Sequence, residues 1–155
     1  MSVVQLERRQ LVLFDLDGTL VDTASDMYRA MNITLRDLGW PEVSETQIRQ
    51  WVGQGTGKLC DAVLTFLFQQ IDPERHQQLL AHYLHVYAQE LCVTSRLFDG
   101  VEAFLQRCQA QHIRMACVTN KPEALARKLL EELDIAHYFD LVVGGDSLPV
   151  RKPDP

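Results

Sequence analysis

The sequence lacks the features of a membrane, secreted or nucleic-acid-binding protein. It has 15 Lys and Arg residues against 21 Asp and Glu residues, and the formal net charge of −6 argues against a broad basic face for nucleic acid. No apolar run approaches the ~20 residues that a membrane helix needs. The first ten residues are polar and contain no apolar signal-peptide segment. We therefore expect a cytoplasmic protein that binds neither membranes nor nucleic acids.

Cysteine is also scarce. The four cysteines form no CxxC pair and no spacing that is typical of a zinc site. Each lies in an apolar run, so we expect buried, reduced thiols. The chain has no internal repeat and no low-complexity tract, and 46% of its 155 residues are hydrophobic. This composition is sufficient for a packed core and argues against disorder.

Three short apolar runs predict β-strands, at residues 11–14, 113–118 and 141–143. Residues 100–111 and 122–133, which precede the second and third runs, have helical periodicity. Strands that alternate with helices imply a parallel sheet with right-handed crossovers. We therefore expect an α/β fold with a Rossmann-like parallel core, in which the first strand is buried on both faces.

A long helical stretch separates the first predicted strand from the others. Apolar residues fall at helical spacing through most of residues 23–95. Ser44 and Gln47 have the spacing of a capping box, and Asp72 followed by Pro73 is typical of a helix start. This stretch is therefore predicted to be entirely helical.

These patterns divide the chain into two parts. Residues 1–22 and 96–155 are expected to form the core, and residues 23–95 are expected to form an all-helical cap inserted after the first strand. Ligands of open parallel sheets bind outside the carboxyl ends of the strands. The chemistry is therefore expected where the predicted strands end.

Two aspartates follow the first predicted strand. Asp15 and Asp17 are two residues apart, and Gly18 permits a sharp turn of the backbone there. Two buried carboxylates this close need a cation or a bound proton to offset their repulsion. Mg²⁺, a hard cation that prefers oxygen ligands, would serve. One carboxylate could then attack phosphorus while the other moves a proton; alternatively, the aspartates only form a turn and cap the next helix.

Polar residues also follow the other two predicted strands. Thr119 ends the second strand and directly precedes a helix that starts at Pro122. A hydroxyl beside a helix N-terminus suits a phosphate oxygen, although Thr119 or Asn120 would also serve as a helix cap. Lys152 follows the third strand, where a lysine close to the chain end is commonly a solvated surface charge.

A glycine-rich loop within the helical stretch superficially suggests nucleotide binding. It contains Gly53, Gly55 and Gly57. A nucleotide-binding loop would need glycine in place of Val52, Ser or Thr in place of Leu59, and a preceding strand. We therefore expect a flexible connection between helices.

Together these motifs resemble those of the haloacid dehalogenase superfamily, in its phosphoglycolate phosphatase-like branch. The string DLDGTLVD at residues 15–22 matches the first motif of the superfamily at every fixed position. Thr119 matches the second motif, and the string KPDP from Lys152 matches the third. The strings WVGQG from Trp51 and TNKP from Thr119 are similar to those of that branch. The resemblance implies a Rossmann-like core whose helical cap closes over the substrate.

The resemblance also implies roles for individual residues. Asp15 would be the nucleophile that forms an aspartyl-phosphate, and Asp17 would be the general acid and base. Mg²⁺ would be held by the Asp15 side chain and the Asp17 backbone carbonyl. Thr119 would bind the phosphate, and Lys152 would neutralise charge on the nucleophile and the phosphate. The substrate contacts that we expect are Gly18, Thr19, Asn120, Arg49, Lys58 and Gly53.

Arg49 and Lys58 are the two cations expected at the organic end of the substrate. They flank the cap loop and could face a substrate carboxylate. Both could equally be solvated charges on the surface of a helix.

The implied activity is the hydrolysis of 2-phosphoglycolate or a similar small phosphorylated metabolite. The alternatives are a sugar phosphomutase of the same superfamily and a catalytically incomplete fragment. The second alternative arises because the fourth, acidic motif of the superfamily follows the lysine motif, and the chain stops at Pro155. We expect low activity without that motif, and a first strand that is exposed as a sheet edge and permits self-association.

Overall fold

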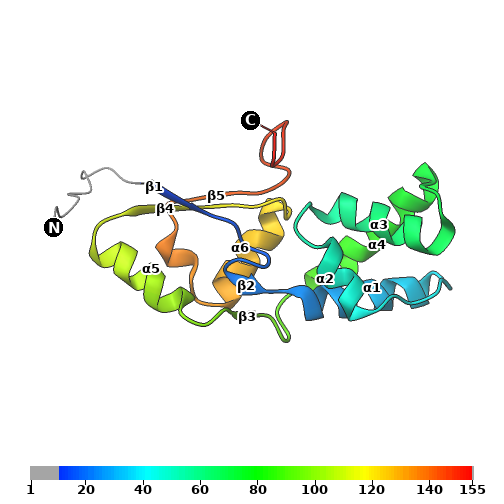
Figure 1. Cartoon of the computed structure of the whole chain (residues 1–155), viewed down its shortest axis with the longest axis horizontal. Helices are drawn as coiled ribbons and strands as arrows, with labels where there is room; N and C mark the ends of the chain where they lie inside the picture. Colours follow the sequence, from blue (N-terminus) through cyan, green and yellow to red (C-terminus); the bar gives the residue numbers. More distant parts are fainter. Residues whose placement is uncertain (1–10, 155) are drawn as a thin grey trace.

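A parallel three-stranded sheet forms the core of the molecule. The computed structural model describes residues 11–154, and its sheet has the strand order β1-β4-β5. The strands are β1 (Leu11–Phe14), β4 (Arg114–Val118) and β5 (Leu141–Val143), and both strand pairs are parallel. One face is covered by α5 (Val101–Ala110), α6 (Glu123–Glu132) and the short 3₁₀ helix Ala136–Tyr138 (Figure 1). The predicted α/β fold with a parallel core is confirmed.

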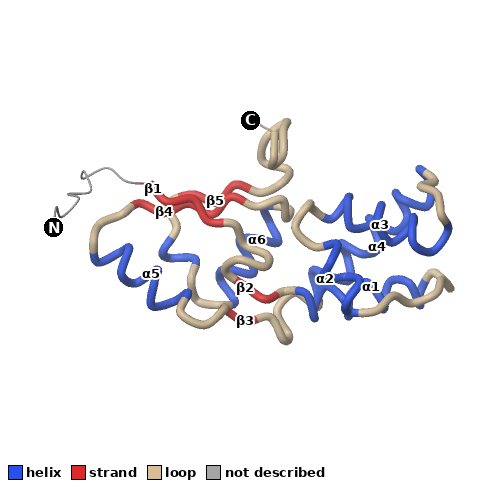
Figure 2. The backbone as a smooth tube through the Cα atoms, viewed as in Figure 1, coloured by secondary structure: helices blue, strands red, loops and turns tan. Residues whose placement is uncertain are grey.

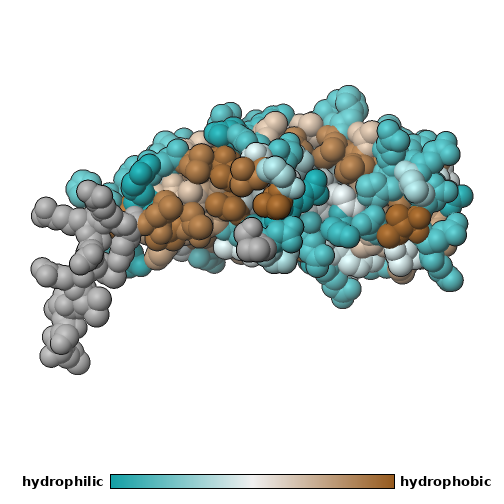
Figure 3. Space-filling model, turned by 90° about the horizontal axis from the view of Figure 1, so that it is seen from above, coloured by the Kyte–Doolittle hydropathy of each residue, from teal (hydrophilic) through white to brown (hydrophobic). Residues whose placement is uncertain are grey.

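The first strand is exposed as a sheet edge, as expected, and is not buried on both faces as its apolar run alone predicts. β1 lies at the edge of the described sheet, and Leu11 and Leu13 are 57% and 62% exposed. The alternate residues Val12 and Phe14 are half-buried, and the Phe14 ring lies 5.9 Å from that of Phe139 in an edge-to-face arrangement. Within residues 11–154 the helices cover one face of the sheet alone, and the opposite face is a continuous apolar surface (Figure 3).

Four helices form the second part of the molecule, which we call the cap. They are α1 (Ala24–Asp37), α2 (Glu45–Trp51), α3 (Thr56–Phe68) and α4 (Pro73–Gln89). Two predicted helix starts are confirmed. Ser44 and Gln47 form the capping box of α2, and the Asp72 carboxylate accepts hydrogen bonds from the first backbone amides of α4.

The chain crosses between core and cap twice, and the two crossings lie side by side. β2 (Val21–Asp22) pairs with β3 (Arg96–Leu97) in an antiparallel ladder, with Val21 opposite Leu97 and Asp22 opposite Arg96 (Figure 2). Two-residue strands are too short to produce a periodic pattern, so neither strand is predicted from the sequence. The predicted boundaries of the cap fall next to this ladder and stay a prediction.

A buried carboxylate fastens the ends of the cap together. Asp26, in the first turn of α1, is fully buried. It accepts hydrogen bonds from five donors, namely the backbone amides of Val93, Thr94 and Ser95 and the hydroxyls of Thr94 and Ser95. Arg29 adds an ion pair at 2.8 Å. Burial acts to raise the pKa of Asp26, but the bonds from Ser95 and Thr94 outweigh it and hold the pKa below its ordinary value.

The cysteines lie in the hydrophobic interior or beside it. All four are free, with Cys60, Cys108 and Cys117 buried and Cys92 half-buried. Among the helices that the structure describes, none combines the length and the apolar character needed to cross a membrane.

Candidate active site

The ends of two neighbouring strands bring the predicted catalytic residues together. Asp15 directly follows β1, and Thr119 directly follows β4, its parallel partner. The parallel register places Phe14 opposite Cys117, so both chains leave the sheet at the same edge. This is the edge at which parallel sheets bind their ligands.

A tight turn after Asp15 positions the second aspartate. Gly18 has φ +77°, a conformation that side chains disfavour. Its amide donates to the carbonyl of Val21 at 2.9 Å, while the amides of Leu20 and Val21 both donate to the Leu16 carbonyl. The turn therefore folds back on itself and presents Asp17 beside Asp15.

Each carboxylate has a lysine partner. The Lys152 ammonium lies 2.9 Å from Oδ1 of Asp15, and the Lys121 ammonium lies 2.7 Å from Oδ1 of Asp17. From the sequence, a divalent cation or a proton is expected to offset the two negative charges. In the structure the two lysines already offset them, so the four side chains together carry no net charge.

Asn120 holds the lysine segment and the cap loop in place. Its side-chain amide donates to the carbonyls of Gly53 (3.2 Å) and Lys152 (3.1 Å), and its Oδ1 accepts from the Lys152 backbone amide at 3.1 Å. The Lys152 ammonium also donates to the Val118 carbonyl at 2.7 Å. Asn120, predicted as a substrate contact, therefore connects three segments that surround the site.

The two glycines after β5 allow the third segment to approach closely. The Gly145 amide donates to the Lys121 carbonyl at 2.8 Å. A Cβ on Gly145 would overlap the backbone carbonyl of Asn120, and one on Gly144 would overlap the backbone of Glu123. Only glycine therefore fits at these positions, which keep the turn after β4 against the end of β5.

The site contains a small inner cavity and a wider cleft at its mouth. The inner cavity has a volume of about 20 Å³, room for roughly one water molecule. It is lined by Asp15, Asp17, Thr119, Asn120, Lys121 and the cap residues Gly53, Gly55 and Thr56, among others. The cleft has a volume of about 660 Å³ and is lined by Gly53, Gln54, Lys58, Asn120, Arg151, Lys152, Pro153 and Asp154. Core and cap thus contribute to both.

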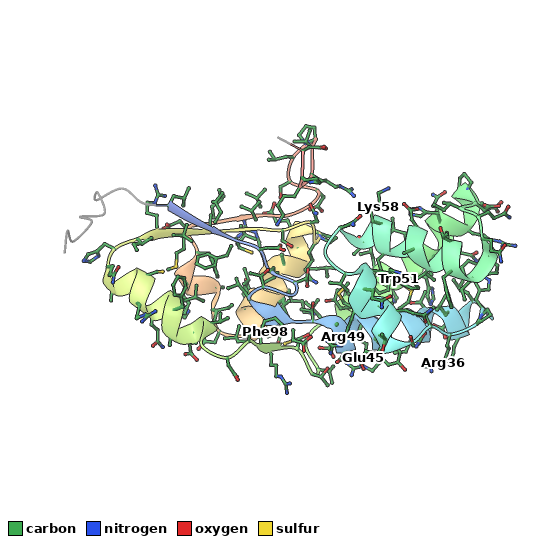
Figure 4. All side chains as sticks on the ribbon, in the orientation of Figure 1. Arg36, Glu45, Arg49, Trp51, Lys58 and Phe98 are labelled. Carbon is green, nitrogen blue, oxygen red and sulfur yellow. The ribbon has the colours of Figure 1, made fainter. Side chains whose placement is uncertain are left out.

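Three predicted substrate contacts lie elsewhere. The first is Arg49, which lies beside the β2–β3 ladder and forms ion pairs with Asp22 at 3.0 Å and with Glu45 at 2.8 Å (Figure 4). Lys58, by contrast, lines the cleft, as expected of a substrate contact. Hydrogen bonds from Arg49 to Asp22 and Glu45 raise the pKa of its guanidinium. Gly18 and Thr19 shape the turn after Asp15 and line neither of the two cavities.

Sequence reasoning did not assign roles to two cations at the site. Lys121 belongs to the TNKP string, which was read only as a similarity, and Arg151 directly precedes the lysine motif. The position of Lys121, two residues beyond Thr119, was a signal, because both residues follow the carboxyl end of β4, where parallel sheets bind their ligands. The exposed Arg151 offered no such signal.

The described residues present oxygen donors of the kind that Mg²⁺ prefers. Both contacts made to the Asp15 carboxylate, from the Leu16 amide and from Lys152, go to Oδ1, which leaves Oδ2 for a cation or for phosphorus. Residues 11–154 contain no group of three or more acidic, His or Cys side chains that could hold a metal ion alone. Because Mg²⁺ usually keeps several waters and binds through one or two carboxylates plus substrate phosphate, this donor set fits it.

The thiol beneath the site stays protonated at neutral pH. Cys117, in β4, is fully buried. Burial, together with the nearby charges of Asp15 and Asp17, raises the pKa of the Cys117 thiol to about 12. The sulfur is therefore part of the packing behind the carboxylates rather than a nucleophile.

Comparison with known proteins places these features in one family. The chain matches the family described as haloacid dehalogenase-like hydrolase over residues 12–155. A phosphoglycolate phosphatase from Nitrosospira multiformis is 42% identical over 148 residues, which make up 93% of this chain and 64% of that protein. Another, from Colwellia psychrerythraea, is 37% identical over 155 residues, 98% of this chain and 69% of that protein. The chain thus spans about two thirds of the length of these curated relatives.

Solved structures have the same fold. The crystal structure of a predicted phosphoglycolate phosphatase from Haemophilus somnus is 31% identical, with a TM-score of 0.87 over 94% of this chain and 67% of that chain. Protein Tyrosine Kinase A from Mycobacterium tuberculosis is 26% identical, with a TM-score of 0.77 over 94% of this chain and 64% of that chain. Since the names of these neighbours denote different reactions, the reaction has to be argued from the site rather than from the fold.

Proposed function

Because the chain belongs to the family of haloacid dehalogenase-like hydrolases, we propose that its site hydrolyses 2-phosphoglycolate, or a similar small phosphate monoester, through an aspartyl-phosphate. The observation that carries this proposal is the pair of strand-end carboxylates, Asp15 and Asp17, each with its own lysine, beside the hydroxyl of Thr119. Curated relatives that share 36–42% identity with the chain are named phosphoglycolate phosphatases, which supports the choice of substrate.

The chemistry follows from the positions of the two carboxylates. Oδ2 of Asp15 attacks phosphorus in line, a P–O bond to the carboxylate forms, and the ester P–O bond breaks. The electron pair of that bond goes to the leaving alkoxide, which takes a proton from Asp17. The Asp17 carboxylate takes up this proton when the phosphate dianion enters the site, so it begins the step as a carboxylic acid. A water molecule then attacks the phosphorus of the aspartyl-phosphate and gives its proton to Asp17. Inorganic phosphate leaves, and the Asp15 carboxylate is restored.

Charge balance supports a metal requirement. The lysines Lys121 and Lys152 are already matched by Asp17 and Asp15, so a phosphate dianion would enter a site with no surplus positive charge. We propose that Mg²⁺, held by the carboxylate of Asp15 and the backbone carbonyl of Asp17, supplies that charge. Thr119, buried at the end of β4, would donate its hydroxyl hydrogen to a phosphate oxygen.

The cleft at the mouth of the site suits a substrate with a second negative group. Three cations and the carboxylate of Asp154 line it. Two of the cations already have acidic partners, since Lys152 pairs with Asp15 and the Lys58 ammonium lies 3.4 Å from Asp61. The third cation is Arg151. Arg151 reaches across to the cap, where its Nη1 lies 3.9 Å from the position of a Cβ built on Gly57. We propose that Arg151, rather than Arg49, faces the carboxylate of phosphoglycolate.

The free thiols are consistent with a reducing, cytoplasmic location.

The experiment measures phosphate release from 2-phosphoglycolate by this chain while Mg²⁺ is titrated. We expect release that depends on Mg²⁺, disappears in Asp15→Asn and persists in Asp37→Asn, an exposed aspartate of α1 that serves as the matched control. Release that Asp15→Asn leaves unchanged would exclude the aspartyl-phosphate. No release from any phosphate monoester by the wild-type chain would contradict the proposed activity.

A further inference from the structure

The most deeply buried charge at the site belongs to a residue without an assigned role. The side chain of Lys121 is 2% exposed and that of its partner Asp17 is 11% exposed. Removing an ammonium from water costs several kcal/mol unless it is closely paired. Lys121 donates to Oδ1 of Asp17 at 2.7 Å and to the hydroxyl of Tyr87 at 2.9 Å, and it lies 4.7 Å from the centre of the Tyr87 ring.

These contacts fix how the Asp17 carboxylate is turned. Oδ1 accepts from the Lys121 ammonium and also from the Thr23 hydroxyl, which donates at 2.8 Å. Two donors on one oxygen prevent rotation of the carboxylate and leave Oδ2 to exchange a proton with the substrate. The donors come from different segments, because Lys121 lies in the turn after β4 and Thr23 directly precedes α1.

The same arrangement connects the carboxylate to the cap. Tyr87 lies on α4, is fully buried, and stacks on Tyr83 with ring centres 5.4 Å apart. Burial raises the pKa of the Tyr87 hydroxyl well above its ordinary value, so it stays neutral and accepts a hydrogen bond from Lys121 without adding a charge. The Lys121 amide also donates to Oγ1 of Thr119 at 3.2 Å, so one turn positions both the phosphate-binding hydroxyl and the ammonium.

We propose that Lys121 is a positioning residue for the acid–base step, and that Tyr87 of the cap holds it in place. This inference rests on the proposed function, in which Asp17 protonates the leaving alkoxide. Lys121 keeps Oδ2 directed toward that oxygen and stabilises the carboxylate that remains after the proton has left. A purely structural role would instead make Lys121 a link between core and cap that affects all substrates equally.

The test compares two substrates that differ in their need for a proton. The alkoxide of 2-phosphoglycolate requires one, whereas p-nitrophenolate leaves without it. Because kcat/KM reports events only up to the first irreversible step, it isolates transfer to Asp15 from the later hydrolysis. In Lys121→Met we expect kcat/KM for 2-phosphoglycolate to fall at least about tenfold, since a positioned acid contributes about 10²–10⁴-fold. The value for p-nitrophenyl phosphate should change less than about threefold.

Further variants keep the test informative if Lys121→Met folds poorly. Tyr87→Phe removes one of the two acceptors of Lys121 and retains the ring, so it should show the same substrate difference with a smaller loss. Lys121→Arg retains the charge and should recover part of the 2-phosphoglycolate activity. Lys128→Met, at an exposed lysine that binds the Ala88 carbonyl, is the matched control and should leave both substrates unchanged. Equal losses on both substrates in Lys121→Met and Tyr87→Phe, or no loss on either, would overturn the proposal.

A crystal structure of Lys121→Met gives a result that does not depend on turnover. We expect the Asp17 carboxylate to rotate away from its orientation in the wild-type chain, with loss of the bond from Thr23. An unchanged carboxylate that still accepts from Thr23 would overturn the positioning role. Failure of the proposed function gives a different result, namely that the wild-type chain releases phosphate from neither substrate.

Discussion

Replacing the buried carboxylate of Asp26 by an amide should strongly destabilise the chain. In Asp26→Asn an NH₂ group takes the place of one carboxylate oxygen. Oδ2 accepts from the backbone amides of Val93 and Ser95, and Oδ1 accepts from the amide of Thr94 and from Arg29. Whichever way the new amide turns, its hydrogens therefore face at least one backbone N–H donor.

The size of the effect follows from these contacts. A hydrogen bond to a charged group contributes about 1.5–3 kcal/mol, and a buried donor left without a partner costs about 1–3 kcal/mol. We therefore expect the free energy of unfolding to fall by about 3 kcal/mol, in line with the ~3–5 kcal/mol found when one partner of a buried pair is removed. For a chain of this length the melting temperature should fall by about 6–12 °C.

The assay is urea and thermal denaturation of the wild-type chain, Asp26→Asn and the control Asp37→Asn. The control changes an exposed aspartate of the same helix, which binds His82, and should alter stability by less than ~0.5 kcal/mol. Because the pKa of Asp26 is lowered in the folded chain, its contribution is complete above the ordinary carboxyl value of 3.8 and is lost as the pH falls through the lowered pKa. The difference between wild type and Asp26→Asn should therefore shrink only in strong acid. A difference below ~0.5 kcal/mol at pH 7 would refute the reasoning.

Two further substitutions test the cleft at the mouth of the site and the close packing of the turn after β4 against the end of β5. Arg151→Gln should raise KM for 2-phosphoglycolate by about tenfold, the equivalent of one 1.4 kcal/mol contact. It should leave KM for ethyl phosphate, which has no carboxylate, unchanged. Equal effects in steady-state assays of the two esters would show that Arg151 does not face the carboxylate. Gly145→Ala should lower stability by about 1–3 kcal/mol, because its Cβ would overlap the Asn120 carbonyl and push the turn away from β5. Thermal denaturation measures this effect, and an unchanged melting temperature would show that the turn adapts freely.

The features that could be predicted from the sequence are those encoded over short distances. The capping box of Ser44 and Gln47 and the start of α4 at Asp72 depend on residues within one helical turn, and both are as expected. The three strands and the convergence of Asp15 with Thr119 follow from the order of the elements. These inferences do not depend on knowing the tertiary contacts between the helices and the sheet.

The features that were missed depend on partners that are distant in the chain. The apolar run of β1 alone predicts burial on both faces, because it does not show which elements cover the strand, whereas Leu11 and Leu13 are exposed. Arg49 is bound by Asp22, 27 residues away, so its direction could not be inferred from its place beside the cap loop. The pairing of Lys121 with Asp17 spans 104 residues and exists only once the sheet has formed.

The stem formed by β2 and β3 makes the cap an interchangeable module. Opposite residues of an antiparallel pair lie about 4.5–5.5 Å apart, so the chain leaves the core at Asp22 and returns at Arg96 through almost the same point. The insertion is therefore joined to the core only through two neighbouring points of the chain, whatever its own structure. Other insertions could therefore replace most of residues 24–95 without moving the ends of β1 and β4, which carry Asp15 and Thr119. Such an exchange would have to keep a hydroxyl in the position of Tyr87, because Lys121 donates to it. Evolution and protein engineering can exchange the rest of the cap independently of the strand ends.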